Sequence, residues 1–251
     1  MTETFWDGLW RDALKSPSAG PHESTWGNAI DRRKMRFLER YVPAEGTVVE
    51  VGCGSARLLA RLGLSSSDLR LVALDESSVA LHLARTTAAA FDVSLSTIRG
   101  TIASLPLPDA SVDIVLSGGF LEHFPEPTPV LAEMVRVLRP GGVLYADVVP
   151  RKISWYRAHE AARMRTSEYM EDGVYESSLD PGDYTQRLRR LGCDVVRTCW
   201  CGVYPWRLQY RRRLGPSIAR ASEILDGTPI ATRWGWYFML VALKPKPPRD
   251  A

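Results

Sequence analysis

The sequence predicts an α/β fold: a seven-stranded, mostly parallel sheet with helices on both faces, N-terminal helices and a helical cap insertion. Three observations lead to this prediction. Short apolar runs alternate with helical segments over residues 47–149, which is typical of strand–helix–strand units. A loop with two glycines follows the first apolar run, and two alternating segments near the C-terminus can complete the sheet.

The individual elements follow from apolar periodicity. Two helices are expected near the N-terminus, at residues 4–15 and 24–41. Five strands are expected at 47–51, 71–75, 93–98, 112–117 and 143–149, with helices at 56–64, 77–91 and 129–138. Beyond residue 150, we expect a helix at 181–191 and strands at 193–201 and 234–243, with a helical insertion between these two strands.

These elements divide the chain into five expected parts. They are an N-terminal helical lid at 1–42, a core at 43–150, a cap insertion at 151–180, the C-terminal part of the sheet at 181–245, and a disordered tail at 246–251. The core carries the regular alternation, so it is expected to carry the site as well.

Composition excludes several classes of protein. The net charge of +3 over 251 residues is too small to indicate nucleic acid by itself. The four cysteines form no CxxC pair and no zinc spacing, so we expect reduced thiols and no metal site. No stretch approaches the roughly 20 apolar residues that span a bilayer. The first residues lack the pattern of a signal peptide, so a cytoplasmic location is expected.

The most informative segment is Val48–Ala56, in which an apolar strand ends at an acidic residue and enters a loop with two glycines. Such a loop lies at the carboxyl end of a strand, where open parallel sheets bind ligands. Arg57 stands where the dinucleotide fingerprint needs its third glycine, and the GK[ST] of a phosphate loop is absent.

The segment resembles the first motif of class I S-adenosylmethionine-dependent methyltransferases, an acidic residue followed by GxGxG, with Ala56 in place of the last glycine. The resemblance covers roughly residues 46–149 and implies a Rossmann-like core with S-adenosylmethionine as the cofactor. It implies that cofactor-binding residues lie in the glycine loop and after the next three strands: Glu50, Gly52, Cys53, Gly54, Asp75, Glu76, Thr101, Ile102, Ser117 and Gly118.

The resemblance also gives these residues individual roles. Asp75, at the end of the second strand, is expected to accept hydrogen bonds from the ribose hydroxyls of the cofactor. Ile102 is expected to pack on the adenine ring, while Thr101 replaces the aspartate that is usual in the family. Either strand-end carboxylate, Glu50 or Asp75, could instead be solvated.

His123 is the first candidate for a general base, because it follows the fourth strand at the edge where cofactor and substrate should meet. Glu122 is the alternative base, and His123 could instead pack against the next element. In the expected cap, Trp155, Tyr156 and His159 combine aromatic and polar groups that can bind a substrate. The same segment could equally be an amphipathic surface helix.

The sequence therefore predicts a methyltransferase acting on a small molecule, with oxygen as the first candidate for the acceptor atom and secondary metabolism as the setting. Two alternatives stay open. One is a peptide or RNA methyltransferase that docks through the Arg-rich C-terminal half, including residues 211–213. The other is a binding protein of this fold without catalytic activity.

Overall fold

Seven strands form one sheet in the order β3-β2-β1-β4-β5-β7-β6. The computed structural model describes residues 4–15, 20–23, 25–155, 157, 173–204 and 214–247. Strands β1 to β5 pair in parallel, whereas β7 runs antiparallel to both β5 and β6. The predicted Rossmann-like sheet, seven-stranded and mostly parallel, is therefore confirmed.

The strands are β1 (Gly46–Val51), β2 (Leu69–Asp75), β3 (Ser96–Arg99), β4 (Val112–Gly118), β5 (Leu138–Val148), β6 (Asp194–Cys201) and β7 (Tyr237–Leu243). The α-helices are α1 (Phe5–Leu14), α2 (Trp26–Leu38), α3 (Arg57–Gly63), α4 (Ser78–Phe91), α5 (Thr128–Val137), α7 (Pro181–Arg190), α8 (Gly215–Ala221) and α9 (Pro229–Trp234). Short 3-10 turns occupy η1 (Glu39–Tyr41), η2 (Leu121–His123) and η5 (Ser222–Leu225).

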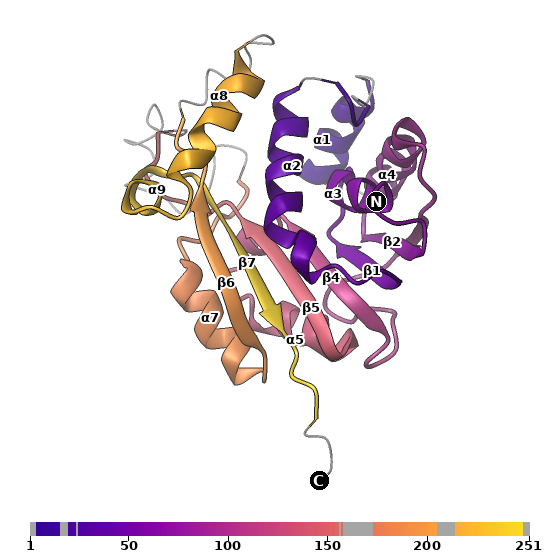
Figure 1. Cartoon of the computed structure of the whole chain (residues 1–251). Coiled ribbons are helices and arrows are strands. Elements are labelled where there is room, and N and C mark those ends of the chain that lie inside the picture. Colours follow the sequence, from indigo (N-terminus) through magenta and orange to yellow (C-terminus); the bar gives the residue numbers. More distant parts are fainter. Residues whose placement is uncertain are drawn as a thin grey trace.

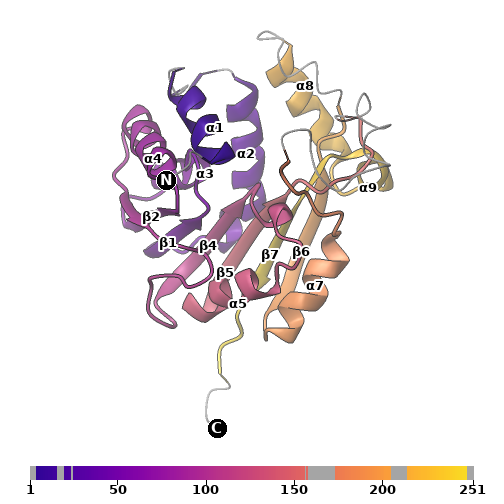
Figure 2. The same cartoon turned by 180° about the vertical axis from the view of Figure 1, so that it is seen from behind.

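Helices cover both faces of the sheet, as Figures 1 and 2 show. Alternate residues of each strand point to opposite faces, so Val48 and Ile114 join the core beneath α2, α3 and α4. Val49 and Val115 join the second core, beneath α5 and α7. Because β1 and β4 are buried on both faces, their sequences are nearly continuous apolar runs.

Three strands begin three or more residues away from their predicted starts. The third strand begins at Ser96 and not at residue 93, because Asp92 adopts a left-handed conformation and Val93 N donates to Ala88 O to close α4. The fifth strand begins early, since Leu138 already pairs with Val112 ahead of the glycine turn. The last strand begins at Tyr237, because the Thr228 cap and Pro229 place Trp234 in α9.

The described ends of the expected cap insertion lie at the carboxyl edge of the sheet. Arg151 N donates to Ser177 O at 2.8 Å, and Ser177 N donates to Glu122 O at 2.7 Å, in the loop after β4. Between these ends, residues 156 and 158–172 lie outside the described residues, as do 205–213 of the second insertion and 248–251 of the tail. Among the described residues, no helix combines the length and apolar character needed to cross a membrane.

Candidate functional site

A cavity of about 790 Å³ opens at the carboxyl ends of β1, β2, β4 and β5, and residues of the N-terminal helix α1 also line it. The strand order reverses between β1 and β4, which is where open α/β sheets bind their ligands. The cavity is lined by nine residues that the sequence singles out as site candidates: Glu50, Gly52, Cys53, Gly54, Asp75, Glu76, Ile102, Gly118 and His123.

The glycine loop forms one wall of the cavity. Gly52 and Gly54 have φ values of +63° and +48°, in the left-handed region that favours glycine. A Cβ on Gly52 would lie 2.4 Å from the Phe120 ring, and one on Gly54 would lie 2.7 Å from the Trp10 ring. The absence of a Cβ at both glycines therefore allows two aromatic rings to contact the loop. The sequence pattern alone does not predict these contacts.

The carboxylate of Asp75 fixes the loop from the end of β2. Its Oδ2 accepts from Gly54 N at 3.0 Å, and its Oδ1 accepts from Ser77 N at 2.9 Å. Burial raises the pKa of Asp75, and the two N–H donors oppose that shift. Each carboxylate oxygen has a second lone pair, so Asp75 can accept further hydrogen bonds from a ligand in the cavity.

Glu50 is buried at the end of β1, with 5% of its surface exposed. Its Oε2 accepts a hydrogen bond from Leu59 N at 3.3 Å, at the start of α3. Burial raises the pKa of Glu50 to about 8, and the Lys34 ammonium opposes the shift. A cationic group entering the cavity would favour the ionised form of Glu50.

Lys34 and Asp147 form an ion pair in the cavity wall that the sequence did not predict. Lys34 Nζ, on α2, lies 2.7 Å from Asp147 Oδ1, at the end of β5. The other oxygen, Asp147 Oδ2, accepts from the Tyr145 hydroxyl at 3.3 Å. Burial opposes the charge on Lys34, but the surrounding carboxylates outweigh it and raise the pKa of Lys34.

His123, at the end of η2, lies at the β4 side of the cavity. Its Nδ1 is 2.8 Å from the carbonyl oxygen of Tyr175. The Trp6 ring meets the imidazole edge to face, with 4.8 Å between the ring centroids. The imidazole is thus held from two sides.

Helix α1 covers the cavity through side chains that sequence analysis did not assign to the site. Trp6, Asp7 and Trp10 all line it. Asp7 completes the capping box of α1 with Thr4 and also accepts a hydrogen bond from the Ser77 hydroxyl, which in turn caps α4. The amphipathic pattern of α1 indicates an apolar face, but not the loop on which that face packs.

Four of the residues predicted for the site do not line the cavity. Thr101 is exposed, and its hydroxyl accepts from Ala103 N. Ser117 and Glu122 are buried outside the cavity lining. Trp155 is 50% exposed and does not line the cavity. Tyr156 and His159 lie outside the described residues.

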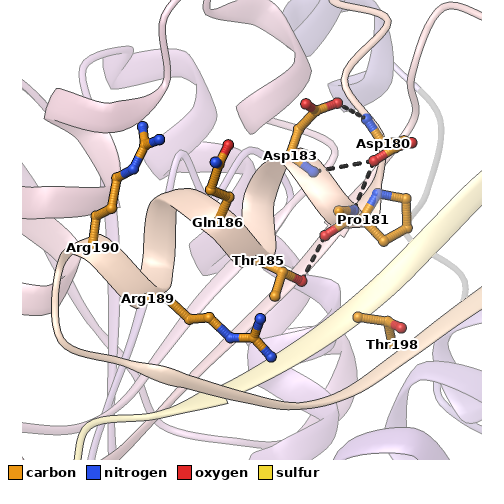
Figure 3. A pocket seen from close by; sticks show the side chains of 9 residues that line it. Asp180, Pro181, Asp183, Thr185, Gln186, Arg189, Arg190 and Thr198 are labelled. Atoms are coloured by element: carbon orange, nitrogen blue, oxygen red, sulfur yellow. Dashed lines mark hydrogen bonds between the residues drawn. The ribbon is translucent and has the colours of Figure 1, made fainter.

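A second, more open depression of about 850 Å³ lies between α7 and β6, and it shares no residue with the cavity described above. Figure 3 shows that Asp180 and Asp183 at its rim are engaged with each other's backbone N–H groups, as the capping box of α7. These carboxylates thus serve the helix end. Within the described part of the chain, no cluster of three His, Cys, Asp or Glu side chains could hold a metal ion.

The residues of the cavity beneath α1 fit the cofactor that the glycine loop implies. The methionine end of S-adenosylmethionine is zwitterionic, and the cavity offers the Glu50 carboxylate, the Lys34 ammonium and the backbone of the loop. Asp75 suits ribose hydroxyls, and the buried side chain of Ile102 suits an adenine ring. When bound, this cofactor supplies an activated methyl group.

Comparisons with known proteins agree with this fit. A family model described as a methyltransferase domain matches residues 49–146. An uncharacterized chloroplastic methyltransferase of Arabidopsis thaliana is 35% identical over 53% of this chain, and the chain spans 38% of that protein. A ubiquinone biosynthesis O-methyltransferase of Xylella fastidiosa is 22% identical, over 73% of this chain and 76% of that protein.

The solved structures support the same fold. The crystal structure of an S-adenosylmethionine-dependent methyltransferase from Aquifex aeolicus superposes with a TM-score of 0.59 at 16% identity, covering 96% of this chain and all of that one. The matched domain contains the glycine loop, Asp75 and His123. Residues 49–146 are therefore a methyltransferase domain, and the chain has the fold of an S-adenosylmethionine-dependent methyltransferase.

Proposed function

We propose that the protein transfers the methyl group of S-adenosylmethionine to a small-molecule acceptor, through oxygen, in secondary metabolism. The observation that carries the proposal is the cavity itself. Its volume of about 790 Å³ lies within the range of small-molecule sites, and α1 covers it. A cavity that is partly covered in this way favours a small acceptor over an RNA or a folded protein.

Two parts of the cavity have separate tasks in this proposal. Glu50, the glycine loop, Asp75 and Ile102 hold the cofactor at the ends of β1 and β2. The acceptor then lies toward the ends of β4 and β5, where Gly118 and Asp147 are paired in the sheet. The donor and the acceptor are thus aligned within one wall of strand ends, and alignment alone supplies much of the rate in methyl transfer.

His123 is the proposed base for an acceptor hydroxyl. It lines the cavity on the acceptor side, and its Nδ1 is engaged with Tyr175 O, so Nε2 is the nitrogen that can take the proton. The O-methyltransferase named among the relatives supports oxygen as the acceptor atom. Trp155, Tyr156 and His159 stay predictions for acceptor contacts. The described ends of their segment support this role because they lie at the same sheet edge. The four free cysteines support a cytoplasmic location.

Transfer of isotopically labelled methyl groups tests the proposal. The purified protein is incubated with methyl-labelled S-adenosylmethionine and a cell extract that has been separated into small-molecule, RNA and protein fractions. We expect label in the small-molecule fraction and an alkoxy or aryloxy methyl group by mass spectrometry. Label in RNA or protein would support the macromolecular alternative. Cofactor binding without any transfer would support a binding protein.

Substitution of the proposed base refines this test. His123→Ala should lower turnover about 100-fold or more if the imidazole takes a proton in the transition state, while cofactor affinity stays unchanged. His82→Ala is the matched control, because His82 is exposed in the middle of α4. A loss below about fivefold would indicate that the enzyme acts by alignment alone, with His123 as a packing residue.

A further inference from the structure

The chain that returns from the cap segment passes directly behind His123. Tyr175 O lies 2.8 Å from His123 Nδ1, and two residues later Ser177 N donates to Glu122 O at 2.7 Å. Arg151 N, just after β5, donates to Ser177 O at 2.8 Å. Two backbone hydrogen bonds and one side-chain contact thus hold the return segment 175–177 at the edge of the site.

The contact with Tyr175 fixes the position of the proton on the imidazole. A carbonyl oxygen can only accept, so His123 Nδ1 carries a hydrogen. In the neutral ring, the basic lone pair is then on Nε2. An unrestrained histidine in water favours the opposite tautomer, with the hydrogen on Nε2, so the protein must hold this contact in place to keep the basic nitrogen available.

Glu122 joins the elements that hold the contact. Glu122 is 2% exposed, and its Oε1 accepts a hydrogen bond at 3.3 Å from the N–H of Val149, the residue just after β5. Its own backbone oxygen accepts from Ser177. One residue thereby ties the loop after β4, the end of β5 and the return segment together, immediately beside His123 in the sequence.

Burying a carboxyl group costs free energy, and the cost is much larger for the ionised form than for the neutral one. The charged or titratable groups facing Glu122 are the carboxylates of Asp147 and Glu176 and the hydroxyl of Tyr184. Burial, together with these carboxylates, raises the pKa of Glu122 to about 8, so the side chain is neutral at pH 7. A neutral amide could then replace it.

The return segment also has an anchor across the cap. The guanidinium of Arg157 binds both carboxylate oxygens of Glu176, between Tyr175 and Ser177, and both side chains are nine-tenths buried. Arg157 precedes and Glu176 follows residues 158–172, so this ion pair joins the two described ends of the segment beside the carbonyl that contacts His123.

We propose that Glu122 is a positioning residue, which holds the return segment 175–177 so that the Tyr175 carbonyl keeps the His123 proton on Nδ1 and leaves Nε2 as the basic nitrogen. The use of Nε2 as a base rests on the proposed function. The tautomer and its dependence on Glu122 do not, because both can be measured without an acceptor.

Nuclear magnetic resonance of the protein labelled with ¹⁵N and ¹³C at histidine tests the proposal. The chain has four histidines, and His123→Gln assigns the signal. In the wild-type protein, the neutral imidazole of His123 should carry its hydrogen on Nδ1. Glu122→Ala should make Nε2–H the major form, whereas Glu122→Gln, which keeps an oxygen for Val149 N, should retain Nδ1–H. Glu126→Ala is the control, because Glu126 is an exposed carboxylate of the same loop.

The Nε2–H tautomer in the wild type, or an unchanged tautomer in Glu122→Ala, would overturn the proposal. If Glu122→Ala does not fold, Glu122→Asp tests the same dependence. The shorter aspartate side chain cannot reach Val149 N, so the fraction of His123 in the Nε2–H form should increase. A tautomer that depends on Glu122, combined with full turnover in His123→Ala, would leave the positioning role intact and refute His123 as the base.

Discussion

Lys34 Nζ, on the second helix, lies 2.7 Å from Asp147 Oδ1, at the end of the fifth strand. The two residues are 113 positions apart in the sequence. Lys34 is the cation that faces the carboxyl groups of Asp147 and Glu50. The Asp147 side chain is 3% exposed and that of Lys34 is 18% exposed. Solvent therefore screens this pair little, and removing one partner leaves a buried charge behind.

Lys34→Met should consequently lower the free energy of unfolding by about 3 kcal/mol, measured by urea denaturation. Adding Asp147→Leu in the same chain should recover part of the loss, because the stranded carboxylate is then removed. Lys15→Met is the control: Lys15 pairs with Asp12 on the surface, and its loss should give no measurable change. Equal losses in both single variants would contradict the buried role of the pair.

Asp75→Ala should weaken binding of the demethylated cofactor by about 1.5–3 kcal/mol in calorimetry, because charge-assisted hydrogen bonds are lost. The substitution also frees Gly54 N and Ser77 N, so part of the effect comes through the loop. Asp68→Ala is the control, because Asp68 is an exposed carboxylate just before β2, at the end of that strand opposite the cavity. Its effect should stay below about 1 kcal/mol. If Asp75→Ala binds the demethylated cofactor as tightly as the wild type, Asp75 does not bind the ribose hydroxyls.

The pKa of Glu50, about 8, predicts a pH dependence of cofactor affinity. Below pH 8 the group is protonated, and a bound cation favours its ionised form, so binding releases a proton. Affinity for S-adenosylmethionine should rise from pH 6 to pH 8, by up to about tenfold per pH unit, and then level off. Glu50→Gln should abolish the slope, and Glu45→Gln, exposed at the other end of β1, should retain it.

The raised pKa of Glu50 also makes the free energy of unfolding of the free protein depend on pH, and this dependence has the opposite direction from that of cofactor affinity. A carboxyl group whose pKa is raised by folding contributes stability below its ordinary pKa, near 4.5, and loses that contribution as the pH rises through 8.

For the affinity measurement, a cofactor affinity that falls between pH 6 and pH 8 in the wild type would contradict the placement of a cation beside Glu50.

Helix α1 should act as a lid on the cofactor. Trp10→Ala removes the ring that rests on Gly54, and we expect dissociation of the demethylated cofactor to speed up about fivefold in stopped-flow fluorescence. Leu9→Ala is the control, since Leu9 is 42% exposed on the same helix. Identical dissociation rates in the two variants would show that α1 does not retain the ligand.

Sequence patterns predicted those parts of the site that are formed by residues close together in the sequence. Glu50, Gly52, Gly54 and Asp75 are found at strand ends and in one loop, and all four line the cavity. Of the two neighbouring residues predicted at the end of the fourth strand, Gly118 lines the cavity and Ser117 is buried outside its lining, because neighbouring residues of a strand face opposite sides.

Other parts of the site depend on chain segments that meet only in the folded protein. Lys34, Trp10 and Tyr175 come from two helices and a distant return segment, and nothing in their own sequence surroundings points to the cavity. Gly52→Val illustrates the difference. Its side chain would collide with Phe120 before it reached a ligand, so the variant tests folding as well as binding.

Calorimetric titration of the purified protein with S-adenosylmethionine and its demethylated product tests the central claim most directly. We predict one site with micromolar affinity, on the order of −7 to −8 kcal/mol, that is weakened in Asp75→Ala and unaffected in His82→Ala. No heat and no thermal shift with either ligand, from a protein that is otherwise folded, would contradict the assignment of this cavity to the cofactor.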